Sequence, residues 1–118
     1  MSDDLKIWQQ VGGIIEGGRK TTRIETFPQK GMFLPQVVTA AVLGAGDRLR
    51  VSRLFVNGVQ AELEVREGPD DPPCTYRVKS PPQDRRNGLT FDVELEEATD
   101  QSVMVQLFGT IVENGSPS

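Results

Sequence analysis

The chain has 118 residues, with 13 Lys and Arg against 17 Asp and Glu, a single cysteine and no histidine. This length predicts one domain with an ordinary core, which a lone Cys74 cannot strengthen with an internal disulfide. Histidine is the usual base near neutral pH and a common metal ligand. Its absence therefore argues against an enzyme, and we expect no catalytic residues, no cofactor and no metal.

The net charge of −4 is unevenly divided along the chain. Residues 1–60 carry eight basic against five acidic residues, and residues 61–118 carry five against twelve. Two explanations fit this division: ion pairs between neighbouring strands, or a basic surface that binds an acidic partner. The candidate partner-binding residues of the second explanation are Arg19, Lys20, Arg23, Arg48, Arg50, Arg85 and Arg86.

Residues 1–35 are expected to form an extended arm. Gly12-Gly13 and Gly17-Gly18 place four glycines within seven residues, which argues against a stable helix. A short strand is expected within the arm at Arg23–Phe27. Apolar side chains on an arm need a surface to dock against, so we expect four more residues to bind a partner: Ile7, Trp8, Ile14 and Ile15.

Residues 36–112 show the patterns of strands. Val37–Leu43 is an apolar run rich in β-branched residues, and Cys74–Lys79 alternates between apolar and polar residues. Leu89–Glu96 has the cleanest alternation, with its leucines, Phe and Val on one parity. Val103–Val112 is apolar on both parities, which predicts a central strand or a strand with one face covered by a partner.

Asn57-Gly58 is the clearest turn signal, because it supplies the two positive-φ residues of a type I′ hairpin. Upstream of the turn, Leu49 and Val51 fall on the wrong parity for the core. A β-bulge near Ser52-Arg53 would return them to it. The expected cross-strand pairs are Val56 with Val59, Leu54 with Ala61, and Arg53 with Glu62.

These elements predict an all-β fold of about seven to eight strands. Many short strands with regular turns are typical of an antiparallel β-sandwich or jelly roll, and a single closed barrel is the second choice. The domain is expected to span residues 36–112. It follows the Gly-rich arm at 1–35 and precedes a flexible tail at 113–118.

Carboxylates are the remaining residues that could support catalysis. Glu62/Glu64 and Glu94/Glu96 each lie two residues apart on the solvent side of a regular strand, where a solvated face is the default. Glycoside hydrolysis instead needs two carboxyl groups across a cleft, one of them with a raised pKa. The Gly68–Pro73 loop contains acidic residues but lacks the spacing of a calcium-binding loop.

Nucleic-acid and membrane binding are not expected. The pI is about 4.8, and seven aromatic residues are few for stacking bases between basic side chains. The N-terminus lacks a signal-peptide pattern, and no apolar run approaches the roughly 20 residues that cross a bilayer. A β-sandwich binds carbohydrate through exposed Trp or Tyr. Trp8 and Tyr76 could serve, which makes a lectin-like module the alternative function.

The expected plan is a Gly-rich arm at 1–35 followed by about eight short strands. In size and plan, the chain resembles the small β-sandwich or jelly-roll cement (decoration) proteins of tailed-phage capsids. The resemblance covers the whole length and is architectural, with no shared motif. It implies a non-enzymatic virion protein, made in the host cytoplasm. It also implies binding between subunits of a major capsid protein, as a homo-oligomer (dimer or trimer) that stabilises the shell.

Overall fold

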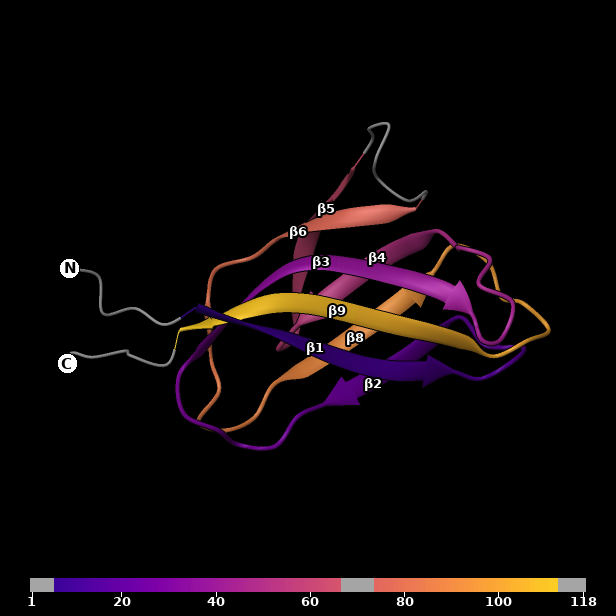
Figure 1. Cartoon of the computed structure of the whole chain (residues 1–118). Helices are drawn as coiled ribbons and strands as arrows, with labels where there is room; N and C mark the ends of the chain where they lie inside the picture. Colours follow the sequence, from indigo (N-terminus) through magenta and orange to yellow (C-terminus); the bar gives the residue numbers. More distant parts are fainter. Residues whose placement is uncertain (1–5, 67–73, 113–118) are drawn as a thin grey trace.

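The computed structural model describes residues 6–66 and 74–112, and within them the chain forms nine strands and no helix. The all-β prediction is confirmed for these residues, with one or two strands more than expected (Figure 1). The strands are β1 (Lys6–Ile15), β2 (Thr21–Glu25), β3 (Met32–Val42), β4 (Val51–Val56), β5 (Val59–Val65), β6 (Thr75–Lys79), β7 (Gln83–Asp84), β8 (Thr90–Leu95) and β9 (Val103–Val112).

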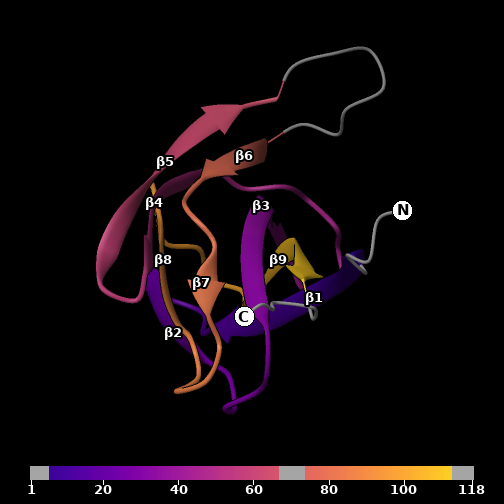
Figure 2. The same cartoon turned by 90° about the vertical axis from the view of Figure 1, so that its left-hand side faces the viewer.

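The nine strands form one antiparallel sheet that is nearly closed into a barrel. The strand order is β1-β9-β3-β6-β5-β4-β8-β2, and β7 pairs with β3. β5 carries the sheet from one side of the barrel to the other, because Val59–Ala61 pairs with β4 and Glu62–Val65 pairs with β6. Seen from the side, β4, β8 and β2 lie opposite β3, β9 and β1 (Figure 2). One nearly closed sheet is closer to the single barrel than to a sandwich of two separate sheets.

The first strands of this sheet come from the segment that was expected to be an arm. All ten residues of β1 pair with β9, from Lys6↔Val112 to Ile15↔Val103, and β2 pairs with β8. Residues 32–35 open β3. The glycines exclude a helix but allow a close-packed strand, since a β-carbon on Gly13 would lie 2.6 Å from Cγ1 of Ile24. The expected boundary at residue 35 is therefore not seen, and the predicted tail and the Gly68–Pro73 loop lie outside the described residues.

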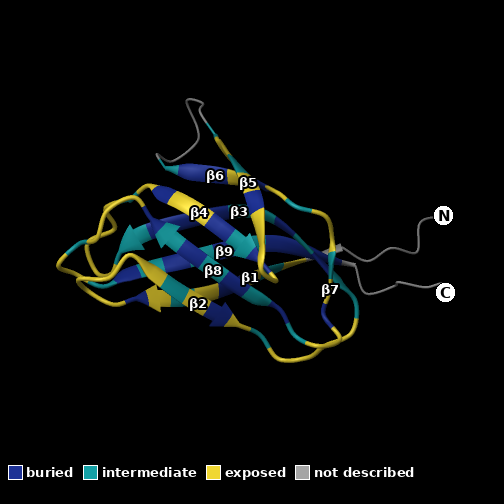
Figure 3. Cartoon of the chain, turned by 180° about the vertical axis from the view of Figure 1, so that it is seen from behind, coloured by how far each residue is buried: buried dark blue, intermediate teal, exposed yellow. Residues whose placement is uncertain are grey.

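The core fills the inside of the barrel. Phe33 of β3 and Phe91 of β8 are fully buried and meet edge to face, with ring centroids 5.9 Å apart. The Phe33 ring packs on Gly109, where a β-carbon would lie 2.5 Å from the ring. The predicted burial of alternate residues in β8 is confirmed, and buried and less buried residues alternate along β8 and β9 (Figure 3). β9 is central, between β1 and β3.

The hairpin at Asn57-Gly58 is confirmed, with φ angles of 50° and 84° and with Val56 opposite Val59. The predicted bulge is also present, because the register between β4 and β8 shifts between Val51 and Arg53. Both features arise from local properties of the chain, namely backbone sterics and side-chain alternation.

The predicted pair between Arg53 and Glu62 is wrong. Arg53 Nε lies 3.2 Å from Glu94 Oε1 on β8, and Glu62 Oε2 lies 3.3 Å from Lys79 Nζ on β6. The cause is the bend in β5, whose ladder with β4 ends at Ala61. Val59 and Val65, at the two ends of β5, are exposed.

Tyr76 of β6 ties the β4 bulge to the inside of the barrel. The Val51 N–H donates a hydrogen bond to Tyr76 Oη over 3.3 Å, and both residues are buried. A bulge leaves backbone groups outside the regular ladder, so the hydroxyl supplies a partner that the sheet does not. Burial also raises the pKa of Tyr76 above its ordinary value of 10.0. Tyr76 is thus a structural residue and not an exposed platform for carbohydrate.

Replacing Tyr76 with Phe keeps the ring but leaves the buried Val51 N–H without an acceptor. We expect Tyr76→Phe to lower the free energy of unfolding by about 1–2 kcal/mol in urea denaturation. The control is Val59→Thr at an exposed position, which should change it by less than about 0.5 kcal/mol. An unchanged unfolding midpoint in Tyr76→Phe would contradict the role of the hydroxyl.

The raised pKa of Tyr76 predicts a specific alkaline response, because Tyr76 is the only tyrosine in the chain. In the folded protein, tyrosinate absorbance at 295 nm should appear at higher pH than in denaturant. The contribution of the protonated Tyr76 hydroxyl to the free energy of unfolding is complete below the ordinary pKa of 10.0. It is lost as pH rises through the higher pKa that Tyr76 has in the folded protein. Identical titrations of folded and denatured protein would show that the hydroxyl is not desolvated.

Candidate functional site

The outer face of three neighbouring strands, β1, β9 and β3, is free of charged side chains between Trp8 and Ile14. Cross-strand partners point to the same side of a sheet, so the register defines this surface. We call it the uncharged face. It consists of Trp8, Gln10, Gly12 and Ile14 on β1, Met104, Gln106, Phe108 and Thr110 on β9, and Leu34, Val37, Thr39 and Ala41 on β3.

The uncharged face is large enough to act as a contact surface. Strand geometry gives it about 20 Å of length and about 14 Å of width, or roughly 300 Å². Its most exposed large apolar side chains are Trp8, 64% exposed, and Ile14, 42% exposed. Thr39 and Thr110 within it are buried, so the exposed apolar area is smaller than this footprint and centres on Trp8 and Ile14.

The remaining outer surface carries charges that pair with one another. Across β2 and β8, Arg23 Nε lies 2.8 Å from Asp92 Oδ1, and this carboxylate raises the pKa of the guanidinium. On β5 and β6, Lys79 Nζ lies 3.3 Å from Glu62 and 3.0 Å from Glu64. The Arg23–Asp92 contact joins the basic half of the sequence to the acidic half, and the Lys79 contacts lie within the acidic half. Pairing between strands therefore accounts for part of the uneven charge division.

Glu64 does not have the properties of a general acid. Its hydrogen bond to Lys79 and the charge of that ammonium hold the pKa of Glu64 below its ordinary value. A glycosidase acid needs the opposite shift. The Glu62/Glu64 pair is therefore an exposed ion-pair cluster around Lys79.

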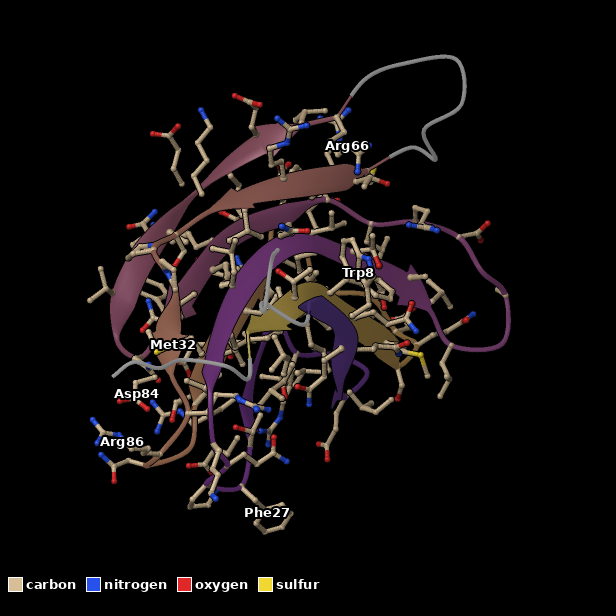
Figure 4. The ribbon with its side chains drawn as sticks, turned by 60° about the vertical axis from the view of Figure 1, so that its left-hand side comes forward. Trp8, Phe27, Met32, Arg66, Asp84 and Arg86 are labelled. Carbon is tan, nitrogen blue, oxygen red and sulfur yellow. The ribbon has the colours of Figure 1, made fainter. Side chains whose placement is uncertain are left out.

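A groove of about 350 Å³ lies at the Trp8 end of the uncharged face. A bulge between Pro35 and Val37 inserts Gln36 into its floor, and Trp8 stands on the same side of the molecule as Arg66 (Figure 4). The groove combines an indole ring, aliphatic side chains, an amide and guanidinium groups. Its lining is Trp8, Leu34, Pro35, Gln36, Val37, Arg66, Arg77 and Val78.

A larger groove of about 460 Å³ lies over β2, β8 and β4 and includes Ile14 and Phe55. Its arginines are occupied by its own carboxylates: Arg23 by Asp92, Arg53 by Glu94, and Arg19 by Glu16 at 3.8 Å. The charged side chains of this groove thus pair with one another.

The predicted partner-binding residues do not form one surface. Trp8 and Ile14 share the uncharged face, whereas Ile15 is completely buried in the core because side chains alternate along β1. Ile7 lies in the same strand, opposite Ile111. The basic residues fall into three places: Arg19, Lys20 and Arg23 at the start of β2, Arg48 and Arg50 before β4, and Arg85 and Arg86 between β7 and β8.

Arg85 is a structural residue. Its side chain is only 8% exposed, and Nη1 donates to the side-chain oxygens of Gln9, over 3.3 Å, and of Gln29. Nη2 donates to the carbonyl of Lys30. Arg85 therefore joins β1 to the loop before β3, across the space where β1 and β2 separate. Arg86 beside it is exposed and pairs with Asp84 at 2.8 Å.

Two sequence patterns indicate the uncharged face, although the prediction of an extended arm did not combine them. Ile7–Ile15 contains no charged residue, and Val103–Val112 is apolar on both parities. Each pattern is visible in the sequence alone. Their adjacency is not, because it depends on the pairing of β1 with β9.

No protein-family model, no curated protein and no solved structure matches this chain. Among the described residues, no three or more His, Cys, Asp or Glu side chains gather where they could hold a metal ion. The same residues include no helix with the length and apolarity needed to cross a membrane. The uncharged face and its groove are thus the candidate functional site, on geometry and surface chemistry.

The adjacent arginines Arg85 and Arg86 provide a matched test of structural and surface roles. We expect Arg85→Met to lower the free energy of unfolding by about 2–3 kcal/mol, because it removes the three charge-assisted hydrogen bonds that the buried arginine donates to Gln9, Gln29 and Lys30. Arg86→Met should change it by less than about 1 kcal/mol, since its ion pair is exposed. Equal losses in urea denaturation would contradict this assignment.

Proposed function

We propose that this protein is a non-enzymatic structural module that binds and stabilises a larger assembly, as a cement protein of a virion capsid. The uncharged face is the observation that carries the proposal. A folded chain that leaves Trp8 and Ile14 exposed on a surface without charge has a surface suited to contact with another protein. The proposed partner is a major capsid protein.

In this proposal, the binding surface is rigid. β1 is already paired with β9, so docking Trp8 and Ile14 orders few additional residues. A face of roughly 300 Å² is less than half of the about 800 Å² per partner in a standard interface. One copy would therefore bind weakly, and several linked copies would bind far more tightly through avidity. The size of the face thus supports a homo-oligomer.

The jelly-roll description belongs to the same proposal. β5 is shared between a layer containing β4, β8 and β2 and a layer containing β3, β9 and β1. Two layers joined through one strand have the general plan of the β-sandwich cement proteins. The protein would then be made in the host cytoplasm and function on the virion.

The test is co-sedimentation of the tagged protein with the lysate of its native source, followed by mass spectrometry of the pellet. We expect the protein to pellet with a large particle and one dominant partner at near-stoichiometric ratio. The double variant Trp8→Gln with Ile14→Thr should stay in the supernatant, because it removes the exposed apolar side chains of the uncharged face.

The matched control is Phe27→Gln with Val59→Thr, which removes two even more exposed apolar side chains outside that face. It should pellet like the unmodified protein. The proposal would be overturned by unmodified protein that stays in the supernatant, or by equal loss in both double variants.

Carbohydrate binding in the groove is the second candidate, and the position of Trp8 is the observation that favours it. The exposed indole lines the groove beside Gln36 and Arg77, an arrangement in which a sugar could stack and accept hydrogen bonds. Trp8 is the only tryptophan, so its fluorescence reports on this groove alone. A saturable change with one glycan of a panel would favour the lectin-like function over the assembly function.

A further inference from the structure

β1 is an open edge of the sheet. It pairs with β9 on one side, and among the described residues no other segment hydrogen-bonds to its backbone. β2, the other edge, approaches β1 at Gly13 and Ile24, but no ladder joins the two strands. Beyond β2 the chain bends away from β1 (Figure 1). Residues 6–11 therefore keep backbone donors and acceptors that point away from the sheet.

This edge lacks the features that normally prevent strand pairing. Proteins protect exposed edges with charged side chains, prolines, bulges or covering segments. Ile7–Ile15 has neither charge nor proline, and its register with β9 runs without a shift. The opposite edge, β2, does carry charges, with Arg23 and Glu25 exposed. Only β1 therefore has the character of a strand that accepts another strand.

The chemistry of the edge also defines what can pair with it. A strand laid beside β1 places its outward side chains next to Trp8, Gln10 and Ile14. A charge there would lose water without gaining a counter-ion, so the partner strand must be uncharged on that side. Within the described residues, β1 meets this requirement from Ile7 to Ile15, after the lysine at its first position, whereas β2 does not.

We propose that two copies of this chain pair through their β1 strands, antiparallel across a two-fold axis. The contact is self-complementary, because the uncharged run Ile7–Ile15 of one copy meets the same run of the other. Pairing joins the two uncharged faces into one surface that spans six strands. Its area is roughly 600 Å², close to the about 800 Å² that each partner buries in a standard interface. The inference deepens the proposed function by naming the first partner, but its test uses the purified protein alone.

The experiment is sedimentation equilibrium of the full chain over micromolar concentrations. We expect a monomer–dimer equilibrium for the unmodified protein. Gln10→Lys should raise the dimer dissociation constant at least tenfold, because it places like charges on the two copies of the edge. An equimolar mixture of Gln10→Lys and Gln10→Glu should recover the dimer through opposite charges.

Gln106→Lys is the matched control, since it makes the same change on the same face but one strand inward, on β9. It should leave the dimer intact. A dimer lost in Gln106→Lys and kept in Gln10→Lys would overturn edge pairing in favour of contact between faces. Circular dichroism and urea denaturation of each variant confirm that the fold is retained.

The two proposals fail in different ways. A monomer at all concentrations that still co-sediments with a shell would overturn edge pairing and leave the assembly function standing. A dimer that binds no particle would support edge pairing and overturn the cement function. A dimer of unchanged strength in Gln10→Lys would place the self-contact elsewhere and overturn the present proposal.

Discussion

The constraint on which this structure depends is the need to bury one face of nine strands around a single core. The sheet meets it by bending at β5, which exchanges β4 for β6 after Ala61. Inside the bend, the hydroxyl of Tyr76 accepts the hydrogen bond of the Val51 bulge and so ties the curled sheet together. The sheet does not close completely, so β1 and β2 remain as its edges. Arg85 joins β1 to the loop between β2 and β3.

Closure also decides how charge is distributed on the outside. Arg23 meets Asp92, Arg53 meets Glu94, and the carboxylates of β5 share Lys79, whereas the outer side of β1, β9 and β3 has no charged residue between Trp8 and Ile14. Exposed ion pairs contribute little to stability, so fold stability alone does not explain this segregation. An uncharged outer face has a cost in solubility, and the contact with another protein that we propose would offset that cost.

Neighbours in the sequence have different roles in this fold. Ile14 and Ile15 are adjacent, yet one is exposed on the uncharged face and the other is in the core. Arg85 and Arg86 are likewise adjacent, yet one is buried among amide and carbonyl oxygens and the other pairs with Asp84 in solvent. Residue type alone made all four candidates for partner binding, and only their position on strands and loops separates them.

The sequence by itself determined the local structure: the all-β class, the alternation of β8, the hairpin at Asn57-Gly58 and the bulge before Arg53. These follow from backbone sterics and side-chain period, which act over a few residues. Only the tertiary structure decided that residues 6–35 join the sheet, that Arg53 meets Glu94 and not Glu62, and that Gln10 lies beside Phe108. The physical reason is that these pairings join distant segments, and their free energy depends on how the whole sheet closes around its core.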